Sequence, residues 1–187
     1  MQKTSDNTKG RIFTIPNILS FVRLAMIPVI CYSYLYLKSS LITCILLFIS
    51  GLTDVVDGYI ARHFNMISDL GKALDPLADK LTQFAVLLCL VSRFSSLMLL
   101  AVLLVVKEII NALGNILVTR KTGVVYGAEW HGKLNTVILY STMVTHLVWY
   151  NIPKTVSLVL IVLSVTIMII SCVLYIIRNV NVLKEKK

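Results

Sequence analysis

The stretch that decides the fold reads D-V-V-D-G-Y-I-A-R at Asp54–Arg62 and, eight residues later, G-K-A-L-D-P-L-A-D at Gly71–Asp79. Its two quoted segments hold four of the nine acidic residues of the chain, Asp54, Asp57, Asp75 and Asp79, at a place where two long apolar segments approach each other. A charge at the centre of a bilayer costs about 2.5–3.5 kcal/mol even on lenient insertion scales, so ionisable residues in such segments are functional by default. The stretch therefore predicts a carboxylate site held by a membrane protein.

The composition supports a polytopic membrane protein. The 187 residues are 57% hydrophobic and 14% charged, with a mean hydropathy of +0.84. The 18 basic residues against nine acidic ones indicate a basic face toward anionic lipid or phosphate ligands. A soluble nucleic-acid-binding domain would share that charge but not this hydropathy, so nucleic acid is excluded as a partner. The four cysteines lie in apolar runs without a C-x-x-C pair, which indicates free thiols.

Long apolar stretches run through the chain, and most have the roughly 20 residues that a helix needs to cross a bilayer. They are Ile15–Leu37, Leu41–Ile60, Leu74–Val91, Phe94–Val118, Leu134–Tyr150 and Val156–Ile177. Because backbone groups cannot stay unpaired in lipid, the segments must be helical. The sequence predicts an all-α fold of six transmembrane helices, the first of them retained and not cleaved as a signal peptide.

The basic residues predict the orientation of the chain. Most of them flank one side of the apolar segments, and only Lys38, Arg93 and Lys154 flank the other. The positive-inside rule then puts both termini and the aspartates in the cytoplasm of a multi-pass cell-membrane protein. We expect one six-helix domain over residues 13–180, between an N-terminal tail or interfacial segment at 1–12 and a basic tail at 181–187.

Helical spacing gives the aspartates a geometry. Asp54 and Asp57 are i,i+3, and Asp75 and Asp79 are i,i+4, so each pair projects from one face of its helix. Gly58 clears space on the same face as the first pair. Oxygen ligands of this number suit Mg²⁺ or Mn²⁺, with room for two ions, and favour chemistry on a phosphate ester. Asp54→Asn is expected to remove a metal ligand and leave the fold intact.

Two other interpretations of the aspartates stay open. The acids could pair structurally with basic residues, but only Arg62, Lys72 and Lys80 are close in sequence. They could also form an ion or proton pathway in a non-catalytic transport or lipid-binding protein. Against this, the acids gather at one end of the segments instead of stepping across the bilayer.

The spacing D-x-x-D-G-x-x-A-R-x(8)-G-x-x-x-D-x-x-x-D resembles the signature of the CDP-alcohol phosphatidyltransferase family. The matching positions are Asp54, Asp57, Gly58, Ala61, Arg62, Gly71, Asp75 and Asp79. The segments T-I-P-N-I-L-S-F-V-R-L-A-M-I-P (Thr14–Pro28) and G-K-L-N-T (Gly132–Thr136) are similar to phosphatidylglycerophosphate synthases and eukaryotic-type cardiolipin synthases of that family.

The resemblance implies a homodimeric six-helix membrane enzyme with a polar cavity open to the cytoplasm. Such an enzyme transfers the phosphatidyl group of CDP-diacylglycerol to an alcohol and releases CMP. The acceptor is expected to be glycerol 3-phosphate, with phosphatidylglycerol, as in a cardiolipin synthase, as the alternative. By position, the four aspartates ligate the metals and Asp79 is also the general base. The CDP-binding positions are Asp57, Gly58, Ala61, Arg62 and Gly71.

Basic residues elsewhere are candidates for the acceptor site, namely Lys133, Arg120 and Lys107, each also explicable as an anchor or, for Lys107 beside Glu108, as a buried ion pair. Asn115 departs from the glycerophosphate-using relatives, which typically carry Arg there, and this leaves room for phosphatidylglycerol. His131, next to Lys133, is expected to be a solvated loop histidine.

Overall fold

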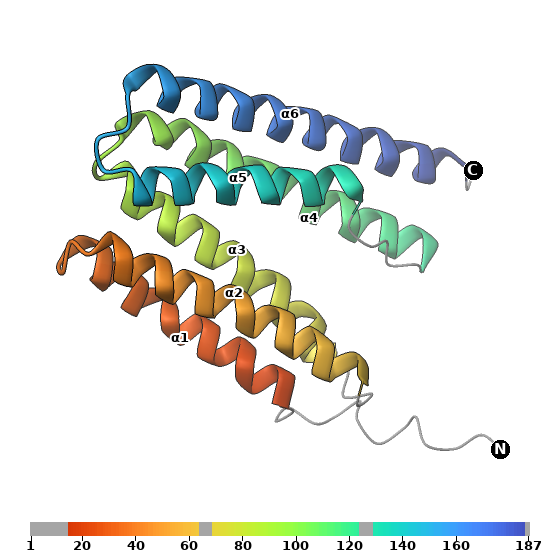
Figure 1. Ribbon diagram of the computed structural model, residues 1–187. Helices are drawn as coiled ribbons and strands as arrows, with labels where there is room; N and C mark the ends of the chain where they lie inside the picture. Colours follow the sequence, from red (N-terminus) through yellow and green to blue (C-terminus); the bar gives the residue numbers. More distant parts are fainter. Residues whose placement is uncertain (1–14, 64–68, 124–128, 186–187) are drawn as a thin grey trace. The chain divides into compact units, whose positions relative to one another are not determined.

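The computed structural model describes residues 15–63, 69–123 and 129–185, and this part of the chain is helical without strands. The helices are α1 (Ile15–Leu35), α2 (Ser40–His63), α3 (Asp69–Val91), the 3-10 turn η1 (Ser95–Leu97), α4 (Met98–Thr122), α5 (Trp130–Val148) and α6 (Lys154–Glu185) (Figure 1). The predicted all-α class is confirmed.

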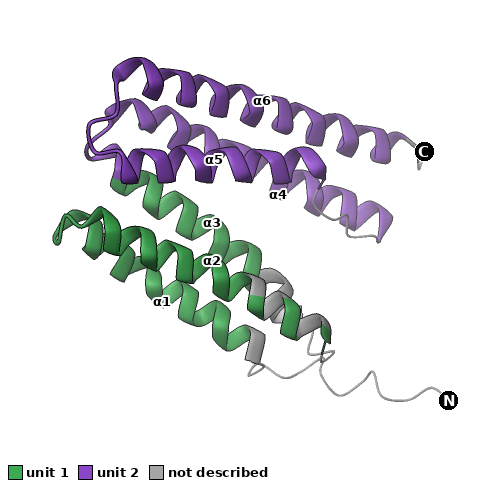
Figure 2. Cartoon of the chain, in the orientation of Figure 1, with its two compact units in different colours: residues 1–89 green, residues 90–187 purple. Residues whose placement is uncertain are grey.

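The chain divides into two compact units, residues 1–89 (unit 1) and residues 90–187 (unit 2), shown in separate colours in Figure 2. In unit 1, α1 packs along α2. Near the turn that joins them, the buried hydroxyls of Ser33 and Thr43 lie 2.8 Å apart in a hydrogen bond. Ile30 of α1 and Leu87 of α3 are fully buried.

Unit 2 is built around α6, which packs against both α4 and α5. Its core is apolar, with Leu100 and Leu104 from α4, Met143 from α5 and Met168 from α6 all at 2% exposure or less. Buried polar contacts cross the α5–α6 interface, for example between the hydroxyls of Thr142 and Ser164 at 2.8 Å. The hydrogen bond offsets the free-energy cost of burying these hydroxyls in an apolar core.

Buried and exposed residues are distributed as a bilayer requires. The described part of the chain buries many polar side chains, among them Ser20, Gln83 and Ser171 at 0% exposure. Large apolar side chains such as Leu158 (60%) and Phe48 (73%) are exposed. A soluble protein does the reverse, because water favours polar surface. The apolar outer surface therefore indicates contact with lipid.

Helices long and apolar enough to span a bilayer are fewer than predicted. Within the described residues they are Asn17–Leu35, Ser95–Thr122 and Lys154–Lys184, with Ser40–Asp54 a shorter apolar helix. α2 and α3 carry the acidic residues, and α5 is interrupted by histidine, asparagine and hydroxyl side chains, which lowers their hydropathy. The structure thus supports a membrane protein, while six transmembrane helices stay a prediction.

Helix boundaries differ from the predicted segments mainly where polar residues extend them. α3 begins at Asp69, ahead of the predicted Leu74, and α6 continues past Ile177 to Glu185. α3 also runs without interruption through Pro76, so Asp75 and Asp79 stay on one continuous helix. α4 ends at Thr122 and is capped by Gly123, whose φ of 71° is left-handed and suits glycine.

Candidate active site

A polar face on α1 organises the acidic residues of unit 1. Asn17, Ser20 and Arg23 lie at i, i+3 and i+6 on this helix and are buried, with exposures of 1%, 0% and 2%. Residues at this spacing share one face of a helix. A buried arginine in an apolar helix must find a negative partner, because the cost of burying a lone charge is high.

That partner is the first aspartate of the motif. Arg23 Nη1 lies 2.8 Å from Asp54 Oδ1 on α2. Ser20, one turn earlier on α1, donates from Oγ to Asp75 Oδ1 on α3 in a short hydrogen bond. Because Ser20 and Arg23 are neighbours on one face, the structure brings Asp54 and Asp75 to the same side of α1, as the motif predicts for two helices that face each other.

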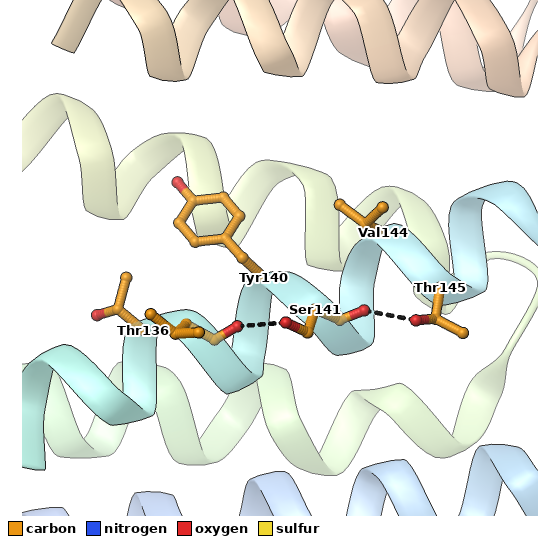
Figure 3. A pocket seen from close by; sticks show the side chains of 6 residues that line it. Thr136, Tyr140, Ser141, Val144 and Thr145 are labelled. Carbon is orange, nitrogen blue, oxygen red and sulfur yellow. Dashed lines mark hydrogen bonds between the residues drawn. The ribbon is translucent and has the colours of Figure 1, made fainter. Parts of the chain in front are cut away.

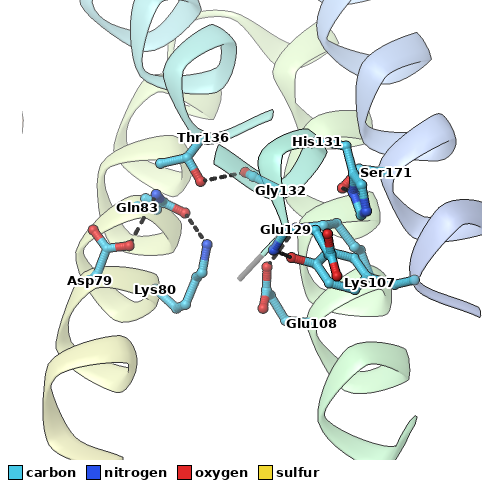
Figure 4. A network of polar contacts seen from close by, with 11 residues as sticks. Asp79, Lys80, Gln83, Lys107, Glu108, Glu129, His131, Gly132, Thr136 and Ser171 are labelled. Carbon is cyan, nitrogen blue, oxygen red and sulfur yellow. Dashed lines mark hydrogen bonds and ion pairs between the residues drawn. The ribbon is translucent and has the colours of Figure 1, made fainter. Parts of the chain in front are cut away.

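Asp79 follows Asp75 by one turn and has an orienting neighbour. Gln83 Nε2 donates to Asp79 Oδ2 at 3.4 Å, and Lys80 Nζ donates to Gln83 Oε1 at 3.4 Å (Figure 4). Both distances are long for hydrogen bonds, so these contacts are weak. Gln83 is itself fully buried, and its amide therefore limits the orientations open to the Asp79 carboxylate.

The other motif residues lie in the same helices, but their side chains fall outside the described part of the structure. They are Asp57, Gly58, Ala61 and Arg62 in α2 and Gly71 in α3. Among the described residues no group of three or more acidic, histidine or cysteine side chains could hold a metal ion. By their chemistry the carboxylates of Asp54, Asp75 and Asp79 are hard oxygen ligands of the kind that Mg²⁺ or Mn²⁺ prefers, but the described side chains do not by themselves form a metal-binding group.

Arg23 is a site residue that the sequence interpretation did not weigh as a partner of the aspartates. Arg23 lies far from the motif in sequence, because the rest of α1, the α1–α2 turn and part of α2 separate it from Asp54. The available signal was the i, i+3, i+6 spacing of Asn17, Ser20 and Arg23 within an otherwise apolar segment.

In unit 2, Arg178 of α6 connects the end of α4 to the start of α5. Its Nη2 donates to Asn115 Oδ1 at 2.9 Å, and its Nη1 lies 3.5 Å from Glu129 Oε1. The guanidinium also lies over the ring of Tyr175, 4.9 Å from its centre. Asn115 is thus bound by an arginine from another helix.

Tyr175 and His131 continue this cluster to the first turn of α5. The Tyr175 hydroxyl accepts a hydrogen bond from the backbone N–H of Glu129 at 3.2 Å. The His131 ring meets the Tyr175 ring edge-on at 4.5 Å, and its Nδ1 lies 3.1 Å from Ser171 Oγ (Figure 4). α6 therefore holds the segment that carries Lys133.

The expectation that His131 is a solvated loop histidine is wrong. It is only 7% exposed, because α5 begins at Trp130 and not at the predicted Leu134. Burial lowers the pKa of His131 below its usual 6.5, Glu129 acts in the opposite direction, and the positive charges of Arg178 and Lys107 lower the pKa further.

The three predicted acceptor residues differ in their surroundings. Lys107 is buried, and its Nζ lies 2.8 Å from Glu108 Oε1, so the ion pair considered from the sequence is present. Arg120, in the last turn of α4, and Lys133, in the first turn of α5, are exposed. A role of these three residues in binding the acceptor stays a prediction.

Beyond Lys133, one face of α5 carries hydroxyls. Thr136, Tyr140, Ser141 and Thr145 line a hollow there together with Val137 and Val144 (Figure 3). The hydroxyls of Thr136, Ser141 and Thr145 donate to backbone carbonyls four residues earlier, at 3.1, 2.8 and 2.7 Å. Such back-bonding satisfies a hydroxyl inside a membrane helix, so this face needs no ligand to explain it.

Comparison with known proteins identifies the family. The sequence profile of the CDP-alcohol phosphatidyltransferases matches residues 13–177, and the chain belongs to this family. Its members generally depend on divalent metal ions.

Individual relatives carry two kinds of name. The CDP-diacylglycerol--glycerol-3-phosphate 3-phosphatidyltransferase of Bacillus subtilis is 33% identical over 159 residues, which cover 76% of this chain and 80% of that protein. A cardiolipin synthase (CMP-forming) / mitochondrial hydrolase fusion protein of Schizosaccharomyces pombe is 42% identical over 102 residues, 54% of this chain and 17% of that protein. The chain spans less than half the length of several such relatives, for example 45% of the Rickettsia bellii phosphatidyltransferase, which is 40% identical over 82 residues.

Proposed function

We propose that this chain is a membrane phosphatidyltransferase that moves the phosphatidyl group of CDP-diacylglycerol to an alcohol and releases CMP. The leading acceptor is glycerol 3-phosphate, which gives phosphatidylglycerophosphate. The observation that carries the proposal is the contact of α1 with two motif aspartates, Arg23 with Asp54 and Ser20 with Asp75. Family membership and the Bacillus subtilis relative support the reaction type.

In the proposed reaction the motif residues and their neighbours on α1 and α3 have separate roles. Asp54, Asp57, Asp75 and Asp79 would hold two Mg²⁺ or Mn²⁺ ions, which supply charge neutralisation at a phosphate ester. Ser20 and Arg23 position Asp75 and Asp54 against α1. Asp79 takes the proton of the acceptor hydroxyl, with its carboxylate oriented by Gln83. The CDP moiety is bound by Asp57, Gly58, Ala61, Arg62 and Gly71.

The test is release of CMP from CDP-diacylglycerol by purified protein in the presence of glycerol 3-phosphate. Asp79→Asn keeps the shape of the side chain and removes the base, so the rate should fall by roughly 10²–10⁴-fold. Asp69→Asn, an acid on the same helix outside the motif, is the matched control and should retain activity. Release of CMP should also stop in excess chelator. A protein that binds CDP-diacylglycerol but never releases CMP would instead be a non-catalytic lipid-binding or transport protein.

A specific observation favours phosphatidylglycerol as a second candidate acceptor. Two of the cations near the start of α5 have protein partners, since Lys107 pairs with Glu108 and Arg178 contacts Asn115 and Glu129, whereas Lys133 is exposed. Because position 115 carries asparagine and not arginine, a phosphate dianion such as glycerol 3-phosphate meets fewer unpaired positive charges there. The chain would then be a cardiolipin synthase, as relatives such as the Mycobacterium tuberculosis putative cardiolipin synthase (43% identical over 74 residues) are named.

The two acceptors are separated by product analysis. Labelled CDP-diacylglycerol is offered with glycerol 3-phosphate or with phosphatidylglycerol, and the lipid products are resolved. Charge-assisted contacts to a phosphate are each worth about 1.5–3 kcal/mol. Lys133→Ala should therefore raise the KM for glycerol 3-phosphate about tenfold or more, with little change for CDP-diacylglycerol. Formation of cardiolipin alone would replace the leading acceptor by phosphatidylglycerol.

The orientation and assembly of the protein are part of the same proposal. We place the enzyme in the cell membrane as a homodimer, with its six helices spanning the bilayer, both termini in the cytoplasm and a polar cavity opening there. The excess of basic residues on one side supports this orientation. A reporter fused after Lys187 should be cytoplasmic and one inserted near Lys154 external, and the opposite pattern would overturn it.

A further inference from the structure

The end of unit 2 that carries η1, the end of α5 and the start of α6 contains a pocket whose lining residues include none of the motif aspartates. These three segments lie together at one end of the unit (Figure 2). The pocket has a volume of about 670 Å³. It is lined by polar and charged side chains, including Arg93, Ser95, Ser96, Asn151 and Lys154, and by apolar ones such as Leu158.

Arg93 is fixed in this pocket by neutral partners. Its Nη2 donates to the backbone carbonyl of Tyr150 at 2.6 Å, and its guanidinium lies over the rings of Tyr150 and Phe94. These contacts hold the side chain in place but leave its positive charge unneutralised. The side chains of Ser95, Asn151 and Lys154 make no hydrogen bond or ion pair with any residue that the structure describes. The pocket therefore presents open hydrogen-bond donors beside an ordered cation.

Acidic residues that could neutralise Arg93 and Lys154 are distant along the chain. The sequence contains no Asp or Glu between Asp79 and Glu108, or between Glu129 and Glu185. Glu108 is ten residues into α4, about 15 Å from its start, and Asp79 is about 18 Å from the end of α3 at 1.5 Å per residue. The N-terminus of the long helix α6 adds partial positive charge at Lys154.

We propose that this pocket binds the phosphate of an anionic phospholipid. Two uncompensated cations and open hydroxyl and amide donors complement a phosphodiester. A zwitterionic headgroup would bring its own ammonium against Arg93 and Lys154, so an anionic lipid is preferred. Leu158 lines the pocket and is 60% exposed, and Val159 beside it is 65% exposed. The acyl chains can therefore run along the apolar outer face of α6. The proposal does not depend on the enzymatic function.

The test uses Trp149 as a reporter, since it adjoins Tyr150 and is 46% exposed. The chain has two tryptophans, so Trp130→Phe leaves Trp149 as the only one. This protein is reconstituted into vesicles of equal phosphatidylglycerol and phosphatidylcholine, with one lipid or the other brominated. Brominated phosphatidylglycerol should quench the fluorescence of Trp149 more strongly than brominated phosphatidylcholine does. The binding constant for phosphatidylglycerol should exceed that for phosphatidylcholine roughly two- to fivefold, which corresponds to a partly exposed ion pair.

Variants decide whether the preference belongs to the pocket. Lys154→Gln should remove most of it, and Asn151→Ala should weaken it, with unchanged helix content by circular dichroism. Lys38→Gln removes one cation from the α1–α2 turn and is the matched control. Equal quenching by both lipids, or a preference that Lys154→Gln leaves intact, overturns the proposal. The proposal is also overturned if Lys38→Gln lowers the preference as much as Lys154→Gln does, because the anionic lipid is then attracted by the overall positive charge and not by the pocket. Loss of the preference on addition of inorganic phosphate would assign the pocket to a soluble anion instead.

Discussion

Gly132, in the G-K-L-N-T segment, offers the sharpest test of how α6 holds the start of α5. A Cβ at Gly132 would lie well inside 3.0 Å of the Tyr175 hydroxyl oxygen, and 3.2 and 3.3 Å from Cζ and Cε2 of that ring. Tyr175 cannot move away freely, because its hydroxyl accepts from the Glu129 N–H and its ring packs on His131. Gly132→Ala should therefore be an overpacking change.

The magnitude follows from this geometry. Forcing an extra carbon into a packed site costs about 1–3 kcal/mol, which lowers the Tm of a chain of this size by roughly 2–12 °C. Gly51→Ala is the matched control, because Gly51 is also helical and a Cβ there meets nothing within 4 Å. That change should be neutral or stabilising, since alanine is favoured over glycine in a helix by about 0.5–1 kcal/mol.

The assay is thermal unfolding in detergent, followed by circular dichroism and by the loss of monodisperse protein. Tyr175→Phe removes the oxygen nearest the new Cβ, so Gly132→Ala should cost less in that background than in the wild-type chain. The coupling between the two changes isolates the steric term. Equal costs in both backgrounds, or a Gly132→Ala variant as stable as Gly51→Ala, would refute the close packing of Gly132 on Tyr175.

Three further predictions follow from the polar contacts. The pKa of His131 is lower in the folded chain than in the unfolded chain, so the unfolded chain binds the proton first as the pH falls through 6.5. Stability should therefore decline on acidification. When the Tm is measured against pH, this decline should be smaller for His131→Gln than for the wild-type chain. Asn115→Arg breaks the 2.9 Å hydrogen bond from Arg178 and also puts a second positive guanidinium beside it. Asn115→Ala removes only the hydrogen bond, which is worth about 1.5–3 kcal/mol of folding free energy. Asn115→Arg should therefore lower the Tm by more than Asn115→Ala, and equal decreases in Tm would contradict repulsion between the two arginines. The sequence alone predicts that Asp54→Asn leaves the fold intact, but the contact with Arg23 changes this expectation. The substitution leaves the buried Arg23 without its carboxylate, so it should destabilise the fold by about 1–3 kcal/mol, and a Tm equal to wild type would show that the ion pair is not formed.

The helices could be predicted from the sequence because their apolar runs are long and the pattern is simple. Their ends could not, since polar residues such as Asp69 in α3 and His131 in α5 extend helices beyond the apolar run. His131 shows the consequence. Its position in the first turn of α5, under Tyr175, follows from a tertiary contact with α6 that no local pattern contains.

The carboxylate pairs could likewise be predicted from spacing, because i,i+3 and i,i+4 positions share a helix face. What spacing could not supply is the partner on a third helix. Arg23 contacts Asp54, and Ser20 contacts Asp75, across long sequence separations. Asn115 is a similar case, since its meaning depends on Arg178 of α6.

The pair of Arg23 and Asp54 also bears on the charge balance of the proposed site. Without metal, Arg23 is the one buried cation that the described part of unit 1 shows in contact with a motif aspartate. Two divalent cations would neutralise four carboxylates in full, and the guanidinium of Arg23 would then remain as excess positive charge beside them. An anionic diphosphate such as that of CDP-diacylglycerol would be attracted to this excess. Arg23 contacts Asp54 without metal, and on the proposed function its charge would favour an anionic substrate once the ions are bound, which would account for a charge in an otherwise apolar helix.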